Sequence, residues 1–451
     1  MTPVIFPAAH RPRRTTDRTG ARLGIALLAY LTAITLVVTL APFAFTRDIV
    51  HGVDLAVRPW DMARHGVMFA PLGFVYQLSR PRGSRVRWGW VAWGAAGLGI
   101  LIETLQLLES TRQASPVDVV SGTLGAVLGA GSFQLLSPSR ESERTVRTLA
   151  VELPVMGLVY LFVPLGWLIG LASAGTARAW LVLPVAAAAA LVLGTVHGAV
   201  LADRARRTMP WLWATCLVWC AVALIPGTVR DPRLMAACAM IMLIIAHIRA
   251  IIASRYNEHH TTRRFERPTL VVIAPLVLLY LAGAAGWPWH DIAWPWPGVA
   301  GLLPAETFST AQIFRPLEQL AAFTLVGYGL AEWDGRVVED TGALAVRVAG
   351  RAGLLAVLLA VATAFLNGRP ASVLLAVLST AAAVMGGRLY SLQRDHVRAL
   401  IRRSIRTMPA AAEISGRRAD SGPEESGPVV NGPVVSGPAS RPAARPASPF
   451  R

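Results

Sequence analysis

The sequence predicts an all-α, polytopic integral membrane protein, a bundle of about twelve transmembrane helices. Of its 451 residues, 54% are hydrophobic and only 15% are charged, and the mean hydropathy is +0.50. A typical soluble domain has roughly 25% charged residues, so this composition excludes an ordinary soluble globular protein. Apolar runs also recur at the length that crosses a bilayer, about 20 residues at about 1.5 Å of rise each.

Each predicted helix is an apolar run bounded by charged residues, glycine or proline. The first six runs are 22–45, 60–79, 88–107, 117–136, 149–171 and 179–201. The last six are 210–229, 233–253, 268–286, 316–331, 343–366 and 371–390. The run 22–45 is too long for the apolar region of a secretory signal, so we expect it to stay as the first span. The run 316–331 is short and begins beside Arg315 and Glu318.

Arginine placement predicts the orientation of these spans. The sequence contains no lysine, so all 43 basic residues are arginines, and the net charge is +17. The arginine-rich stretches are Arg11 to Arg18, Arg80 to Arg87, Arg140 to Arg147, Arg204 to Arg207, Arg255 to Arg267 and Arg388 to Arg406. Alternation along the chain puts all of them on one side, which the positive-inside rule identifies as cytoplasmic. We therefore expect both termini inside, a multi-pass protein of a cytoplasmic membrane, contacts with membrane lipids and no nucleic-acid partner.

Composition shifts divide the chain into four segments. Residues 1–21 form a basic cytoplasmic tail, 22–136 a four-helix transmembrane module, and 137–407 a second transmembrane domain of about eight helices. Residues 408–451 are rich in Gly, Pro and Ser and repeat an S/N-G-P pattern that cannot bury a core, so a disordered cytoplasmic tail is expected. The acidic stretch 331–340 is interpreted as solvated charge in a loop. The sequence does not predict the oligomeric state.

Polar residues interrupt the third and fourth runs and carry the main functional hypothesis. Glu103 and Gln106 lie at the end of the third span, Arg112 in the following loop, and Asp118 at the start of the fourth. Ionisable groups at membrane depth cost roughly 2.5–3.5 kcal/mol each on insertion scales, so such a group usually has a function. We expect these residues to share one layer at the outer ends of the helices.

The same layer should receive side chains from the second span. Asp61 and His65 are four residues apart and so share one helix face, and Ser121 follows Asp118 by one turn. A purely structural interpretation stays open for Asp61 and Asp118, because acids in a first helical turn complement the macrodipole. Glu103 lies near a helix C-terminus, where an anion is disfavoured, so it needs a partner such as Arg112, His65 or a bound cation.

Small residues near this layer predict close helix packing. Gly125 and Gly129 form a G-x-x-x-G pattern, which lets membrane helices approach closely but does not indicate a function. The expected packing residues are Gly122, Gly125, Gly129, Pro71 and Gly73.

These residues resemble the VanZ-like family of membrane proteins over about residues 22–136. The match includes a Glu-x-x-Gln pair, a loop arginine, an aspartate and a glycine-rich helix, here Glu103, Gln106, Arg112, Asp118, Gly125 and Gly129. A segment from Phe69 to Phe74 resembles the second-helix signature of the family. Ser121 departs from it, because an asparagine is expected there. The resemblance implies a bacterial membrane module linked to glycopeptide (teicoplanin-type) antibiotic resistance, without an established reaction.

Three functions remain open at this point. The polar layer is expected to bind the head group of an envelope lipid or a cell-wall precursor, with a role in cell-envelope physiology or glycopeptide tolerance. A secondary transporter is an alternative, because the stretch His197 to Arg207 is similar to a loop of major-facilitator transporters. A membrane-embedded enzyme acting on a lipid-linked substrate is another, although catalytic residues cannot be named. The sequence has no metal-ligand or cofactor-binding motif, so neither a metal nor a cofactor is predicted.

Overall fold

The computed structural model describes most of the membrane-spanning part of the chain. The described residues are 13–45, 52–80, 86–110, 113–136, 143–173, 176–200, 208–227, 231–257, 266–287, 298, 310–335, 337–338, 340–367 and 370–420. Residues 1–405 form one compact unit and 406–451 a second, and each is described by itself.

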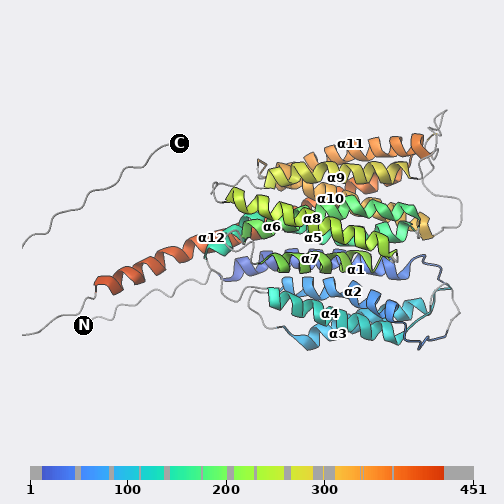
Figure 1. Cartoon of the computed structure of the whole chain (residues 1–451), viewed down its shortest axis with the longest axis horizontal. Coiled ribbons are helices and arrows are strands. Elements are labelled where there is room, and N and C mark those ends of the chain that lie inside the picture. Colours follow the sequence, from blue (N-terminus) through green and yellow to red (C-terminus); the bar gives the residue numbers. More distant parts are fainter. Residues whose placement is uncertain are drawn as a thin grey trace, which may run out of the picture. The chain divides into compact units, whose positions relative to one another are not determined.

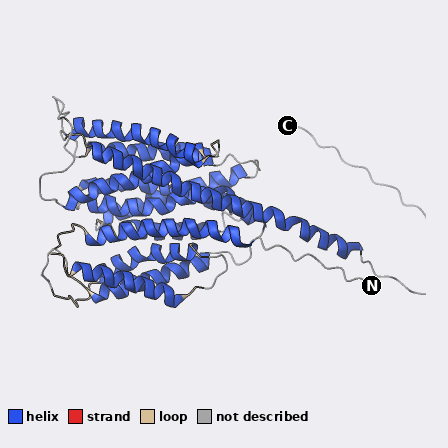
Figure 2. Cartoon of the chain, turned by 180° about the vertical axis from the view of Figure 1, so that it is seen from behind, coloured by secondary structure: helices blue, strands red, loops and turns tan. Residues whose placement is uncertain are grey.

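The elements of the described residues are twelve α-helices and one short 3₁₀ helix, with no strand (Figure 2). In chain order they are α1 (Arg13–Leu40), α2 (Pro59–Leu78), α3 (Trp88–Gln106), α4 (Pro116–Leu136), α5 (Glu143–Ser173), η1 (Ala177–Leu181), α6 (Val182–Val200), α7 (Met209–Leu224), α8 (Pro232–Asn257), α9 (Glu266–Gly286), α10 (Thr310–Asp334), α11 (Thr341–Asn367) and α12 (Val373–Asp420). The predicted helical membrane bundle is therefore confirmed.

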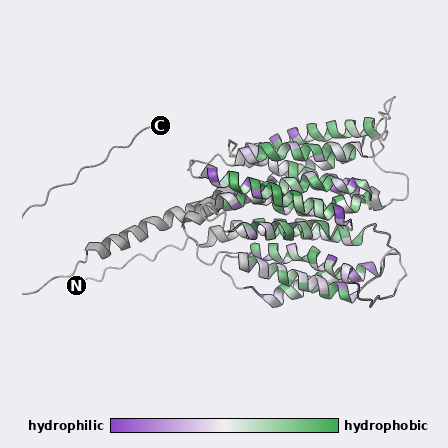
Figure 3. Cartoon of the chain, in the orientation of Figure 1, coloured by the Kyte–Doolittle hydropathy of each residue, from purple (hydrophilic) through white to green (hydrophobic). Residues whose placement is uncertain are grey.

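Hydropathy distinguishes two groups of helices. Within the described ranges, seven helices are long and apolar enough to cross a membrane, and two shorter apolar helices are Gly157–Ser173 and Met209–Leu224. Helices α2, α3 and α10 are absent from both groups, and all three carry buried acidic or amide side chains. Apolar residues dominate the helices, with isolated hydrophilic positions among them (Figure 3). The three helices outside both groups are thus candidates for function.

Several helix bounds extend beyond the predicted spans. Helix α10 begins at Thr310, so it is longer than the run 316–331 and its length is no longer marginal. Helix α12 continues to Asp420, past the expected end of the membrane domain near residue 407. The added stretch, 408–420, contains four alanines and two arginines, which are good helix formers, together with Pro409 and Gly416, which are poor ones.

The four N-terminal helices pack closely through small residues. Helices α2 and α4 make an extensive contact, and α3 lies alongside α4 (Figure 1). A Cβ atom added to Gly125 would collide with the carbonyl of Gly66, and one added to Gly129 would collide with that of Ala70. Gly73 lies against the backbone of Ala126 in the same way. Helices α2 and α4 are therefore in backbone contact along several turns.

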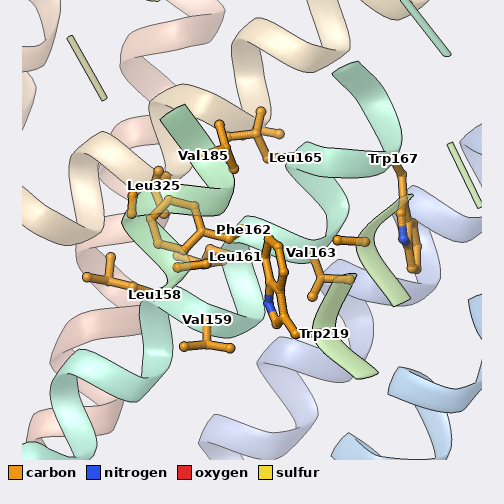
Figure 4. Packing of buried hydrophobic residues seen from close by; sticks show 14 of the residues in the cluster. Leu158, Val159, Leu161, Phe162, Val163, Leu165, Trp167, Val185, Trp219 and Leu325 are labelled. Carbon is orange, nitrogen blue, oxygen red and sulfur yellow. The ribbon is translucent and has the colours of Figure 1, made fainter. Parts of the chain in front are cut away.

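Helix α5 is the central element of the larger helix group. It contacts α6, α7 and α10, and its buried face carries a continuous set of large apolar residues (Figure 4). Phe162 and Trp167 have no exposed surface, and the Trp167 indole Nε1 donates a 2.7 Å hydrogen bond to the carbonyl of Val222. Without water in the bilayer, this bond satisfies the indole N–H inside the protein.

Candidate functional site

The α1–α2 loop and the α3–α4 loop contact each other at one end of helices α1 to α4. The α1–α2 loop lies against the α3–α4 loop through an isolated bridge between Phe45 and Glu109. The carbonyl of Ala44 accepts hydrogen bonds from the Ser110 backbone N–H at 3.1 Å and from its hydroxyl at 3.2 Å. These contacts fix the loops over the helix ends, where Asp61, Glu103 and Asp118 lie.

Glu103 anchors the start of α4. It is 9% exposed, and its Oε2 accepts a 2.5 Å hydrogen bond from the backbone N–H of Ser115. The carbonyl of Ser115 accepts in turn from the Asp118 N–H at 3.0 Å. The sequence indicated that Glu103 needs a partner near the end of α3 but did not identify this backbone group. Arg112, one of the expected partners, lies outside the described residues.

Gln106 and Ser121 make contacts that keep the helix ends together. The Gln106 Nε2 donates to the carbonyl of Thr39 at 3.0 Å and so links α3 to the end of α1. The Ser121 hydroxyl donates to the Asp118 carbonyl at 3.1 Å, within its own helix. Gln106 therefore binds the end of α1, whereas Ser121 stays beside Asp118.

His65 and Asp118 form a pair between α2 and α4. The His65 Nδ1 lies 3.3 Å from Asp118 Oδ1 and 3.0 Å from the backbone carbonyl of Asp61. The two side chains are 11% and 16% exposed, so each keeps a small accessible surface. Among the described residues, the half-buried Asp61 carboxylate has no hydrogen bond or ion pair. Asp61, His65 and Asp118 therefore carry the polar groups of the layer that could bind a ligand.

The close packing of α2 and α4 brings this pair together. Gly66 follows His65 directly, and its carbonyl is the group that Gly125 approaches. The ring of Phe69 lies against Gly122, one turn after Asp118. Pro71 lies inside α2, two residues after Phe69. The predicted packing residues therefore lie in or near the contact that sets the His65–Asp118 distance.

Glu109 was missed in the sequence, although it is completely buried in the α3–α4 loop. An acidic residue three positions before Arg112 was a signal that the pattern of membrane spans did not use. Within the described chain, no group of three His, Cys, Asp or Glu side chains could hold a metal ion. The described residues of the layer thus combine two buried glutamates with three more accessible groups, Asp61, His65 and Asp118.

Comparison with known proteins gives one match. Residues 1–137 match the family model described as VanZ/LLP1, which confirms the resemblance seen in the N-terminal helices. No curated protein and no solved structure matches this chain.

Proposed function

We propose, taking residues 1–137 as a VanZ/LLP1 module of a multi-pass membrane protein, that its polar layer binds the head group of an envelope lipid or a lipid-linked cell-wall precursor. The observation that carries this proposal is the accessible group of Asp61, His65 and Asp118 beside buried, backbone-bound glutamate and glutamine. A role in the bacterial cell envelope, including glycopeptide tolerance, would follow from such binding.

Some residues of the layer hold the loops in place and others could contact a ligand, which supports a binding site. Glu103 and Gln106 bind backbone groups, which holds the loops and the first turn of α4 in place. Asp61 lies in the first turn of α2 and Asp118 in the first turn of α4. The Asp118 side chain is 16% exposed. Helix ends that meet the head-group region place such side chains where lipid ammonium and phosphate groups lie. A carboxylate binds an ammonium group, and a protonated imidazole binds a phosphate.

The pairing of His65 with Asp118 is the element that a head group would use. An imidazole beside a carboxylate presents both a donor and an acceptor over a few ångströms. Asp61 adds an acceptor that is not engaged elsewhere in the described chain. This set suits a zwitterionic head group better than a purely apolar ligand.

The test is retention of a head-group lipid by the purified full-length protein. Native mass spectrometry should detect a bound envelope lipid or precursor on the wild type and lose it on Asp118→Asn and His65→Gln. Asp231→Asn is the matched control, because Asp231 precedes α8 and is exposed, outside residues 1–137. Equal lipid retention by all four proteins, each folded, would contradict the proposal.

The transporter and enzyme alternatives predict other results. A transporter would lose uptake or efflux of a solute in Glu103→Gln while the folded protein persists, and an enzyme would form product when purified. Residues 201–207, which carry most of the transporter-like stretch, lie outside the described residues. The contacts of the described helices favour neither alternative over head-group binding.

A further inference from the structure

Helix α10 contains two equally buried glutamates that differ in their surroundings. Glu318 and Glu332 are each 1% exposed. The oxygens of Glu318 accept from the Arg178 guanidinium and from the Tyr280 hydroxyl, both at 2.7 Å. In contrast, neither carboxyl oxygen of Glu332 has a hydrogen-bond partner, and no described side chain forms an ion pair with it. Glu332 was expected to be solvated charge, and its burial corrects that interpretation.

An ionised Glu332 would be strongly unfavourable at this position. A buried carboxylate without a partner loses its hydration and gains nothing in return, so it takes up a proton instead. Glu332 also lies in the last turn of α10, which ends at Asp334, and the negative end of the helix dipole disfavours a second anion there. Asp334 itself forms an ion pair with Arg351, 2.8 Å away on α11.

The groups around this end of α10 are polar but give Glu332 no counter-charge. Tyr328, one turn earlier on the same face, donates from its hydroxyl to Gln393 Oε1 of α12 at 2.9 Å. The ring of Tyr390 lies edge-on to that of Tyr328 at 5.6 Å. Gly157, where the described side chains of α5 begin, leaves space for the Tyr328 hydroxyl. Because this hydroxyl donates its hydrogen to Gln393, its oxygen can still accept one.

The arginine of α12 at this end is already engaged. The Nη1 of Arg394 donates to the carbonyls of Gly335 and Val338 at 2.9 and 3.1 Å, beyond the last residue of α10. The titratable and charged groups described here are therefore Tyr328 and Asp334 on α10, Arg351 on α11, and Tyr390 and Arg394 on α12. None of them forms a salt bridge with Glu332.

We propose that Glu332 is a reversible proton-binding site of the C-terminal membrane helices. At neutral pH the side chain holds a proton as a carboxylic acid, and at alkaline pH the proton leaves and a carboxylate remains. No other bond forms or breaks. The site lies on α10, outside residues 1–137, so it is independent of head-group binding. In a membrane helix, such a group is typical of proton-coupled steps.

Infrared difference spectroscopy of the full-length protein in lipid bilayers tests this proposal. The wild type should show a protonated carboxyl stretch at neutral pH that disappears as the pH rises, and Glu332→Gln should lack it at every pH. Asp340→Asn is the matched control, since Asp340 is exposed at the start of α11 and should leave the band unchanged. Absence of the band from the wild type, its survival in Glu332→Gln, or its failure to titrate would overturn the proposal.

Two further readouts keep the result independent of folding. Glutamine resembles a neutral carboxylic acid in shape, so Glu332→Gln should match the wild type in thermal stability at acidic pH, where Glu332 is protonated in both the folded and the unfolded protein, and should be the more stable protein at neutral pH. Because only the folded protein would hold the proton, the stability of the wild type should fall as the pH rises. The stability of Glu332→Gln should fall less over the same pH range. The experiment is repeated with sodium salts replaced by choline salts. A band that sodium removes at constant pH would show that a metal cation displaces the proton, and it would contradict a site that only protons occupy.

Discussion

Replacing Gly125 by alanine should weaken the contact that holds the two halves of the polar layer together. A methyl group at this position would collide with the backbone carbonyl of Gly66, which directly follows His65. A backbone carbonyl cannot rotate away as a side chain does, so α2 and α4 must separate. Such overpacking costs about 1–3 kcal/mol. The better helix propensity of alanine offsets roughly 1 kcal/mol of this loss of stability.

The net loss should therefore be about 1–2 kcal/mol, taking the upper part of the overpacking range because the obstacle is backbone. Gly94→Ala is the matched control, because Gly94 lies in α3 and an added Cβ atom would meet nothing within 4 Å. The free energy of unfolding of this control should rise by up to about 1 kcal/mol. Thermal unfolding of both variants in one detergent, monitored by circular dichroism, measures the difference. Equal melting temperatures would refute the close contact between α2 and α4.

Two other predictions concern buried and exposed acids. Arg178→Leu should destabilise the protein by about 3–5 kcal/mol because Glu318 loses its counter-charge in the interior; the double variant Arg178→Leu/Glu318→Leu should recover much of the loss in chemical unfolding, and no recovery would contradict the pairing. The backbone N–H groups of Ala343 and Gly342 lower the pKa of Asp340. Its contribution to stability is therefore present above the ordinary Asp pKa and lost as the pH falls through the lowered one. Asp340→Asn should reduce this acid-side loss in a melting-temperature series, and an identical pH profile would contradict it.

The fold was predictable because a bilayer imposes a simple rule on sequence. Apolar runs of about 20 residues have few alternatives to a membrane helix, so the all-α class was correctly predicted, and the described residues form twelve α-helices, seven of them long and apolar enough to span. The residues at which the helices begin and end were less predictable. Helix α12 continues to Asp420, well beyond the apolar run, and hydropathy did not indicate this extension.

The candidate site was predictable in its residue types and less so in its contacts. Polar residues in apolar helices drew attention to Glu103, His65 and Asp118, since such groups are costly at membrane depth. The partner of Glu103 is a backbone N–H of Ser115, and every residue other than proline has one, so no pattern of side chains reveals it. Glu109 and Glu332 were missed or misinterpreted because loop-like acidic sequence normally indicates solvent exposure.

The central claim is that the polar layer binds a head group, and ligand-induced thermal stabilisation tests it most directly. Purified wild type, Asp118→Asn and Asp231→Asn are heated with a panel of envelope lipids and cell-wall precursors. A ligand at 100 times its Kd adds about 2.7 kcal/mol to the stability of the folded state. The account predicts that one head group raises the melting temperature of the wild type and of Asp231→Asn but not of Asp118→Asn. A panel that shifts none of the proteins, or shifts all three equally, would contradict it.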